Sequence, residues 1–525
     1  MLTRVTRHLR RTARRHGEGG QALIFVLIAV ALLGTIPIAI ATTTVDQLPQ
    51  TTRNLNYEAA YEAAQAGLND YLQHLDANEG YALCTASSPS SSCTSNSALT
   101  GWVQASSSPL EYYSYTPSDT NGQVTLQVSG KAGTGNTVVV RTFSYNIDPA
   151  SSLDDVYWSN YETLDPALGG TGCSVYYGQG SGPPNSCVVV FTTGDVLNGP
   201  VFSDDTFRMC GSPTFDDSVE SGNIYNTNSG PSAVYVASSG CGSLSPNFNG
   251  GTPTKVGNQT PRTSTDDLAP ARNYGCFITG GTAPNSLSTV TVTLTLSVVS
   301  GHTQVTWSGS GAKVDNATSN TSNCTSPINL NNLTQGLIFV NGTVKISGSM
   351  TGALDIVTCG TSTDDSTKST ACTSSDPSTN PSNIDVTGNL TYPSANKTMV
   401  SGQPVSDSSD VLGLVASNFV EVTTTSNVEI DAAILALGDS FYVNNWNGGA
   451  SYGTLSVFGS IAQDYRGPVG LTNGAGYTKN YNYDNSLQTV FPPFFIPPNG
   501  ATWTPSSYEE CGSGLSHSVL NTPQC

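Results

Sequence analysis

The chain has 525 residues, of which only 19 are basic and 38 are acidic, so charged side chains make up 11% of it. A typical soluble domain carries about 25%. Together with 53 glycines and 29 prolines, this composition argues against a helix-rich cytosolic enzyme. It predicts a folded chain built mainly of β-strands and turns.

The charge is unevenly distributed along the chain. The first twenty residues hold six arginines and a single acidic residue, Glu18, whereas the remaining residues hold 13 basic and 37 acidic side chains. An acidic body disfavours nucleic acid as a partner. A basic segment directly before an apolar one instead indicates membrane topology, with the N-terminus in the cytoplasm.

The apolar segment is Ala22 to Ile40, and no charged residue follows it until Asp46. Nineteen residues at a helical rise of about 1.5 Å match the hydrocarbon core of a bilayer. We therefore expect a single membrane crossing within residues 21–45 and a body outside the cell. The alternative is a cleaved secretory signal, because Ala39-Ile40-Ala41 fits a signal peptidase site and would leave Thr42 as the first residue.

Residues 51–77 are rich in Ala, Leu, Glu and Gln and contain no proline, which predicts a soluble helix within an amphipathic segment 46–80. The apolar stripe of this helix consists of Ala60, Ala64, Leu68, Leu72 and Leu75. Glu58, Glu62, Asn69 and Gln73 fall outside the stripe.

Two stretches resemble the type IV pilins and their minor, PilX-like relatives. The first is Gly17-Glu18-Gly19-Gly20-Gln21-Ala22-Leu23-Ile24, and the second is the Ala- and Glu-rich run 59–68, which ends in Ala66-Gly67-Leu68. By this resemblance, a prepilin peptidase cuts between Gly20 and Gln21, and the N-terminal helix packs against other pilin-like subunits. The resemblance covers about the first eighty residues.

The sequence departs from the major-pilin pattern at two positions. Gln21 stands where the family usually has Phe or Met, and Phe25 stands at the fifth mature position, where the family usually has Glu. In the family, that Glu is thought to pair with the new amino terminus of a neighbouring subunit. An apolar residue there removes a buried counter-charge. The departure favours a minor, tip or initiating role over a repeating filament subunit.

The rest of the chain shows strand and turn patterns. Val124 to Val128 and Val138 to Tyr145 predict a hairpin, and short apolar runs with small polar corners follow, most regularly between residues 338 and 462. Such runs favour a parallel β-helix-like solenoid, with a β-sandwich as the alternative. The region also resembles the β-rich ectodomains of some Gram-positive PilX-like proteins.

Twelve cysteines lie beyond the apolar segment, and an even number outside the membrane indicates disulfides rather than metal ligation. Sequential pairs are the simplest expectation, because 84 with 93, 173 with 187, 359 with 372 and 511 with 525 each close a short loop. The candidates are Cys84, Cys93, Cys173, Cys187, Cys210, Cys241, Cys276, Cys324, Cys359, Cys372, Cys511 and Cys525.

Motifs for catalysis are few, so we expect no enzyme activity, no cofactor and no metal site. Five Asp pairs occur at 154–155, 204–205, 216–217, 266–267 and 364–365, and solvated turns explain them better than calcium binding. The aromatic clusters at 157–161, 176–177 and 477–483 could bind sugars, but packing between strands is the better explanation.

These observations favour a membrane-anchored, pilin-like structural protein of a type IV pilus or a type II secretion-like assembly. The alternatives are a secreted β-helix polysaccharide enzyme, for which only Asp355, Asp385 and Asp431 are candidates, and a surface adhesin that uses Trp158 or Tyr161. The expected parts are a basic leader (1–20), a transmembrane helix (21–45), an amphipathic helix (46–80), a Ser-rich loop and hairpin (81–150), a β-helix-like ectodomain (151–495) and a Cys-containing tail (496–525).

Overall fold

The computed structural model describes the chain from residue 51 to residue 511, with gaps. The described residues are 51–75, 81, 97–107, 110–120, 123–149, 152–223, 230–238, 240–259, 268, 275–282, 286–314, 324–333, 336–360, 382–393, 398–400, 403–405, 410–488, 490–495 and 503–511. Strands dominate these residues, which confirms the prediction of a mainly β chain.

Residues 51–75 form one helix, as the Ala- and Leu-rich pattern predicts. On the predicted stripe, Ala60, Ala64, Leu68 and Leu75 are buried and Leu72 is half-buried. The polar positions that the pattern places outside the stripe are exposed. The helical spacing of the apolar residues therefore predicted the buried face correctly.

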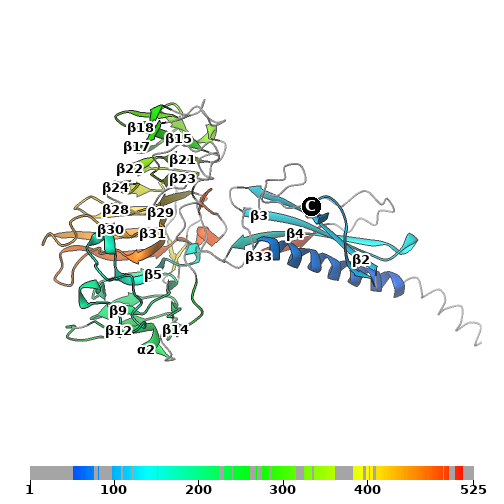
Figure 1. Cartoon of the computed structure of the whole chain (residues 1–525), viewed down its shortest axis with the longest axis horizontal. Helices are drawn as coiled ribbons and strands as arrows, with labels where there is room; N and C mark the ends of the chain where they lie inside the picture. Colours follow the sequence, from blue (N-terminus) through cyan, green and yellow to red (C-terminus); the bar gives the residue numbers. More distant parts are fainter. Residues whose placement is uncertain are drawn as a thin grey trace, which may run out of the picture.

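An antiparallel sheet covers the apolar face of this helix (Figure 1). The predicted hairpin is confirmed: β3 and β4 pair from Val124 opposite Ile147 to Ala132 opposite Val139. We call the helix and this sheet the base. The sheet has the order β1–β2–β3–β4–β33, with β1 Val103–Ser107, β2 Leu110–Thr120, β3 Gln123–Ala132, β4 Val139–Pro149 and β33 Trp503–Glu510.

Two glycines allow the helix to approach the sheet closely. A Cβ atom at Gly130 of β3 would collide with the Ala60 carbonyl oxygen and the Ala64 amide nitrogen. A Cβ atom at Gly67 of the helix would lie 2.9 Å from side-chain atoms of Tyr113 and Val128. Only glycine fits where two backbones come this close.

Strand β33 comes from the segment that the sequence predicted as a Cys-containing tail. It pairs with β4 along its whole length, from Trp503 opposite Pro149 to Glu510 opposite Phe143. Its sequence, WTPSSYEE, has no apolar alternation, so its pattern did not predict a strand. Because β4 and β33 are neighbours, the whole segment between them, which we call the body, is inserted between two adjacent strands of the base.

The body is a stack of layers joined by parallel strand pairs (Figure 1). The strands expected between residues 338 and 462 are present, although Val428–Ala436 and Ser451–Arg466 each merge two expected short strands into one. One parallel ladder runs through ten strands: β15 (Cys276–Thr282), β21 (Leu337–Val340), β23 (Ala353–Thr358), β27 (Val411–Ala416), β29 (Val428–Ala436), β31 (Ser451–Arg466), β5 (Tyr157–Leu164), β8 (Val201–Ser203), β11 (Val219–Ser221) and β14 (Thr254–Lys255).

Further ladders form the other faces of the stack. The second ladder runs through β17 (Val290–Val299), β22 (Gly342–Ser349), β24 (Ile384–Thr391), β28 (Val420–Val422) and β30 (Phe441–Val443). The third joins β31 to β32 (Gly476–Tyr483), β7 (Val196–Asn198), β10 (Thr214–Phe215) and β13 (Asn247–Phe248).

The order of the layers differs from the order of the chain. The chain enters the body at β5, in the middle of the stack, and proceeds through β8 and β11 to β14 at one end. It then continues from β15 at the opposite end and returns layer by layer to β31, which pairs with β5. Figure 1 shows the colours of early and late residues side by side at this junction. We call the contact of β31 and β32 with β5 and β7 the seam.

A column of stacked aliphatic side chains fills the interior. In-register pairing places Ile338, Ile356, Leu414, Ile434 and Ile461 above one another, and all five are fully buried. Each buried aliphatic side chain contributes roughly 1.5–3 kcal/mol relative to an exposed one. No single layer could bury its own inward face, so the stability of each layer depends on its neighbours.

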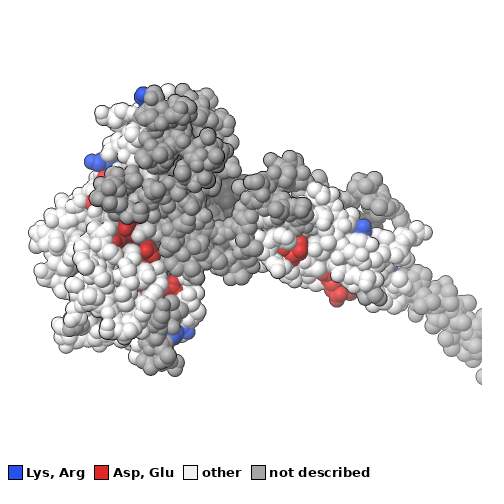
Figure 2. All heavy atoms as spheres, viewed as in Figure 1, with Lys and Arg blue, Asp and Glu red and all other residues white. Residues whose placement is uncertain are grey.

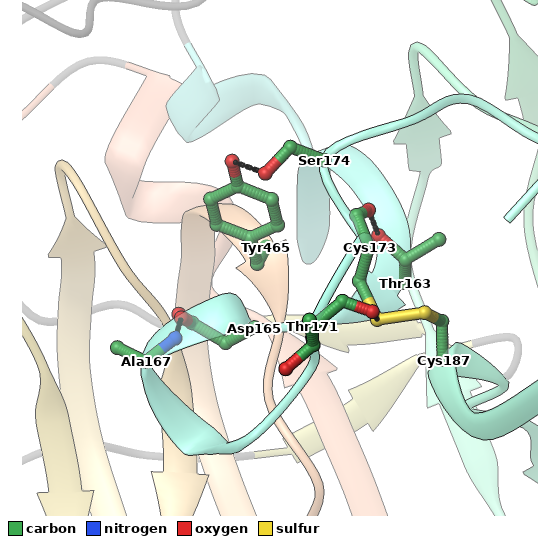
Figure 3. Close-up of a disulfide and its surroundings, with 8 residues drawn as sticks. All are labelled: Thr163, Asp165, Ala167, Thr171, Cys173, Ser174, Cys187 and Tyr465. Atoms are coloured by element: carbon green, nitrogen blue, oxygen red, sulfur yellow. Dashed lines mark hydrogen bonds between the residues drawn. A yellow bond between two sulfur atoms is a disulfide. The ribbon is translucent and has the colours of Figure 1, made fainter. Parts of the chain in front are cut away.

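Three disulfides are described, and all of them join consecutive cysteines: Cys173–Cys187, Cys210–Cys241 and Cys276–Cys324. The first is one of the pairs expected from the sequence. Figure 3 shows that it closes the loop after β5, where Thr163 donates a hydrogen bond to the Cys173 carbonyl. Cys359 and Cys511 are also disulfide-bonded, whereas Cys84, Cys93, Cys372 and Cys525 lie outside the described residues.

Candidate functional site

The predicted processing residues, Gly20 and Gln21, and the predicted membrane segment 21–45 lie outside the described residues. Within the described part of the chain, no helix is both long enough and apolar enough to span a bilayer. The first described residues after these segments are at the start of the helix, at residue 51.

Several large apolar side chains of the base are exposed to solvent. Six such side chains are exposed in the described part of the chain, and Leu55, Tyr57, Val138 and Tyr508 are four of them. Leu55 and Tyr57 lie on the first helical turns, and Val138 follows Thr137, whose carbonyl accepts a hydrogen bond from the Asn56 side chain. Tyr508 on β33 stacks on Tyr145 at 5.7 Å. We call these four side chains together the apolar patch, although they do not form one continuous surface: Leu55 and Tyr57 are two positions apart on the helix and so point to opposite flanks of it.

The helix start and the turn between β3 and β4 lie at the end of the base that points away from the body (Figure 1), whereas Tyr508 pairs with Tyr145, closer to the end of β4 from which the chain enters the body. Asn56 contacts the turn between β3 and β4, whereas β4 enters the body at its other end, after Pro149. Single exposed apolar side chains are common on protein surfaces, and only a continuous apolar area indicates a contact with another protein or a membrane. In the sequence, the apolar segment 22–40 precedes this helix.

An ion pair fixes the surroundings of the patch. The Arg141 guanidinium on β4 donates two hydrogen bonds to the Glu510 carboxylate on β33, at 2.7 and 2.9 Å, and lies 3.9 Å from the Tyr57 ring centroid. These hydrogen bonds lower the pKa of Glu510 below its usual value. The Tyr57 hydroxyl donates to the same carboxylate at 3.2 Å. The pair thus joins the helix, β4 and the strand that closes the base.

The seam holds a second unusual feature, a group of charged side chains inside the body. Arg466 on β31 donates to Glu162 on β5 at 2.6 Å, and their side chains are 2% and 0% exposed. Lys479 on β32 donates to Asp195, just before β7, at 2.8 Å. Both pairs connect the late part of the chain to the early part. Sequence reasoning missed them, although Lys479 stands between Tyr477 and Tyr481 at inward-facing positions.

The carboxylates nominated for an enzyme lie on three different strands, and each has its own surroundings. Asp355 on β23 accepts a hydrogen bond from the Phe494 amide at 3.0 Å, and burial raises its pKa to about 7. Asp431 on β29 accepts one from the Tyr392 amide at 2.8 Å. Asp385 on β24 has a pKa of about 6, raised by burial and then by Glu421. Two of the three carboxylates, those of Asp355 and Asp431, thus accept hydrogen bonds from backbone amides of other segments.

The prediction of solvated Asp pairs was wrong for Asp204 and Asp205, which are 1% and 0% exposed. Asp205 accepts hydrogen bonds from the Tyr177 and Thr206 amides, and Asp204 accepts one from the Gln259 amide. Burial raises the pKa of Asp204 to about 7 and that of Asp205 to about 8. They are buried because a tight corner leaves backbone N–H groups that need acceptors. The pairs 266–267 and 364–365 lie outside the described residues.

The aromatic residues considered for adhesion pack within the body. Trp158 is 3% exposed, stacks on Phe202 and donates from its indole nitrogen to Gln259 at 2.9 Å. The Tyr161 ring is stacked with Tyr176 and with Tyr465, at 4.4 and 4.9 Å. The expectation that these clusters pack between strands is therefore confirmed for Trp158 and Tyr161.

The outer surface agrees with the low charge of the sequence. Figure 2 shows one face, on which most of the described atoms belong to uncharged residues and Asp and Glu appear in small separate groups. No strongly charged region stands out on the described part of that face. The apolar patch is therefore the more distinctive surface feature of the base.

Comparisons with known proteins give little further information. No family model matches the sequence, and no curated protein does. Among solved structures, the chain is similar to the crystal structure of the competence-associated pilin ComZ from Thermus thermophilus. The two sequences are 11% identical, the alignment covers 87% of this chain and 97% of that chain, and the TM-score is 0.27. At this TM-score the two folds superpose poorly, so the likeness supports no conclusion about this chain.

Proposed function

We propose that the protein is a membrane-anchored, pilin-like structural protein that displays the body on the outside of the cell. The observation that carries this proposal is the order of the apolar segment 22–40 and an amphipathic helix that packs one face on the sheet and exposes the other. Leu55, Tyr57, Val138 and Tyr508 are exposed on the base, so a membrane or another subunit that packs there would remove apolar surface from water. The exposed face of the amphipathic helix is available for such a contact.

The base supports this proposal by its construction. One face of the helix is packed on the sheet through small residues, while the opposite face stays free for neighbours. We propose that the N-terminus faces the cytoplasm, that prepilin peptidase removes residues 1–20, and that other pilin-like subunits pack along the helix. Phe25, at the position of the family's usual glutamate, fits a minor or initiating subunit better than a repeating one.

We further propose that the body is a parallel β-helix. Parallel ladders that connect successive layers support this, because the sheets of a β-sandwich are antiparallel. We propose that its role is to present a surface rather than to catalyse a reaction. Asp355 and Asp431 accept hydrogen bonds from backbone amides, which gives them a structural role, and Trp158 is buried. The disulfides fit an oxidising, extracellular location.

The mature N-terminus tests the proposal. In the native host, mass spectrometry of the membrane fraction should find a chain that begins at Gln21. Gly20→Asp should abolish this cleavage, because an acidic side chain would replace the glycine at the cut site, and Ala41→Leu, the matched control, should leave it unchanged. A chain that begins at Thr42, together with loss of cleavage in Ala41→Leu only, would replace the proposal with a secreted protein.

A further inference from the structure

Lys479 and Asp195 meet inside the body at the seam. Lys479 lies on β32, and Asp195 directly precedes β7; the parallel register, with Asn480 opposite Val196, brings the two side chains together. The Lys479 Nζ atom is 2.8 Å from the Asp195 Oδ2 atom. The two side chains are 7% and 1% exposed. An amine and a carboxylate that are almost 300 residues apart in sequence are therefore in contact in a site closed to water.

The Asp195 carboxylate is held in a fixed orientation. The Thr192 amide donates to Oδ2 at 2.9 Å, and the Lys479 amide donates to Oδ1 at 3.2 Å. The backbone thus fixes both oxygens while the ammonium group approaches one of them. Reacting groups held in contact by a rigid fold react far faster than the same groups in solution.

The surroundings favour the neutral form of the lysine. The Phe191 ring is fully buried, and its centroid lies 5.8 Å from Lys479 Nζ and 3.6 Å from the guanidinium carbon of Arg466. Burial lowers the pKa of Lys479, although the Asp195 charge opposes this effect. A lysine that burial and a neighbouring cation shift toward its neutral form is a nucleophilic amine, and Arg466 is such a cation here.

We propose that Lys479 and Asp195 condense to form an intramolecular amide bond, a covalent modification that goes beyond the function proposed above. The ammonium first gives one proton to the carboxylate, which leaves an amine and a carboxylic acid. The lone pair of Nζ then attacks Cγ, so that a Nζ–Cγ bond forms and one Cγ–O bond breaks. The departing oxygen leaves as water with two of the three Nζ protons, and no other reactant is consumed.

The buried charges supply the physical reason for the reaction. An ion pair inside a protein loses hydration energy that its attraction repays only partly. The amide is uncharged, so condensation removes this cost, and exclusion of water hinders the reverse hydrolysis. The bond joins β32 to the segment before β7 and so locks the late half of the body to the early half.

The neighbouring ion pair provides a control within the same molecule. Arg466 and Glu162 are buried to the same degree and also face each other across the seam. A guanidinium stays protonated and does not act as a nucleophile. The chemistry therefore predicts an amide at Lys479 and an unmodified Arg466.

Mass spectrometry of the full-length mature protein, reduced and denatured, tests the inference. We expect a mass lower than the sequence mass by one water, and trypsin should cut after Arg466 but not after Lys479. The expected product is a branched peptide in which residues 142–208 are joined to residues 467–525. Asp195→Ala and Lys479→Arg should each restore the full sequence mass, and the first should restore cleavage after residue 479.

The wild-type protein alone decides the question if a variant fails to fold. A wild-type mass equal to the sequence mass, with free Lys479 and free Asp195 in separate tryptic peptides, would overturn the inference. A loss of one water that persists in both variants would also overturn it, because another pair of residues would then carry the bond. The Cys173–Cys187 disulfide, mapped without reduction, serves as the check that each variant has folded.

Discussion

Removal of the Glu162 charge is the sharpest test of the seam. In Glu162→Gln, the Arg466 guanidinium would lose its ionic partner at 2.6 Å while remaining 2% exposed. Glu162 also accepts hydrogen bonds from the Tyr157 and Ser159 hydroxyls, at 2.8 and 2.6 Å, so its second oxygen is in use. Breaking a buried pair by removing one charge costs about 3–5 kcal/mol. We expect a loss of unfolding free energy in that range.

Urea unfolding followed by tryptophan fluorescence measures this loss. Trp158, one of the five tryptophans that contribute to this signal, lies on β5 at the seam and packs on Phe202. The matched control is Glu509→Gln, on the exposed face of β33, which should change the free energy by less than about 0.5 kcal/mol. The double variant Glu162→Gln with Arg466→Met should recover part of the loss, because no buried charge would remain. Equal urea midpoints for Glu162→Gln and Glu509→Gln would refute the argument that the seam depends on this charge pair.

Three further results are expected. In Gly130→Leu, the new side chain on β3 should collide with the Ala60 backbone, push the helix away from the sheet and lower the unfolding free energy by about 1–3 kcal/mol. The control Gly101→Ala, whose nearest neighbouring atom is at 3.9 Å, should leave the unfolding free energy unchanged. Proteolysis of the helix should be faster in Gly130→Leu than in Gly101→Ala. Burial raises the pKa of Asp464 to about 7, so its proton stabilises the fold below about pH 4, and this stability is lost as the pH rises through 7. Urea midpoints at pH 5 and pH 8 should therefore differ less in Asp464→Asn than in the wild type. Arg141→Met should lower the unfolding free energy by up to about 1 kcal/mol, because Arg141 and Glu510 are partly exposed. Loss of the ion pair should also speed cleavage of β33 by a glutamate-specific protease. An unchanged cleavage rate would contradict the view that Arg141 holds β33 on the base.

The sequence predicted the local elements well because their signals are local. The spacing of Ala60, Ala64 and Leu68 reports a helix face directly, and short β-branched runs such as Val420–Val422 report strands. The pairing of β31 with β5 depends on residues some 300 positions apart, and no local pattern encodes it. The same limit applies to β33, whose polar sequence forms a strand only because β4 offers it a partner.

The candidate site was predictable only in part. Leu55 and Tyr57 belong to the predicted amphipathic segment, but Tyr508 comes from the predicted tail and joins the base through β33, where it stacks on Tyr145. The buried charges were harder to predict, because a lysine or arginine in a strand ordinarily faces water. Arg466 and Lys479 face inward because Glu162 and Asp195 neutralise them there. Their role becomes visible only when both halves of the chain are in place.

Because the body is inserted between β4 and β33, the number of its layers can change during evolution without a change in the base. The chain enters the body at β5, in the middle of the stack, and before it returns to β33 the Phe494 amide donates a hydrogen bond to Asp355 on β23, on the β15 side of the seam. The layers of β11 and β14 lie on the other side of the seam, so we expect a change in their number to leave the base and the helix in place. The arm of the body that ends at β14 can therefore vary in length while the base and the seam stay the same.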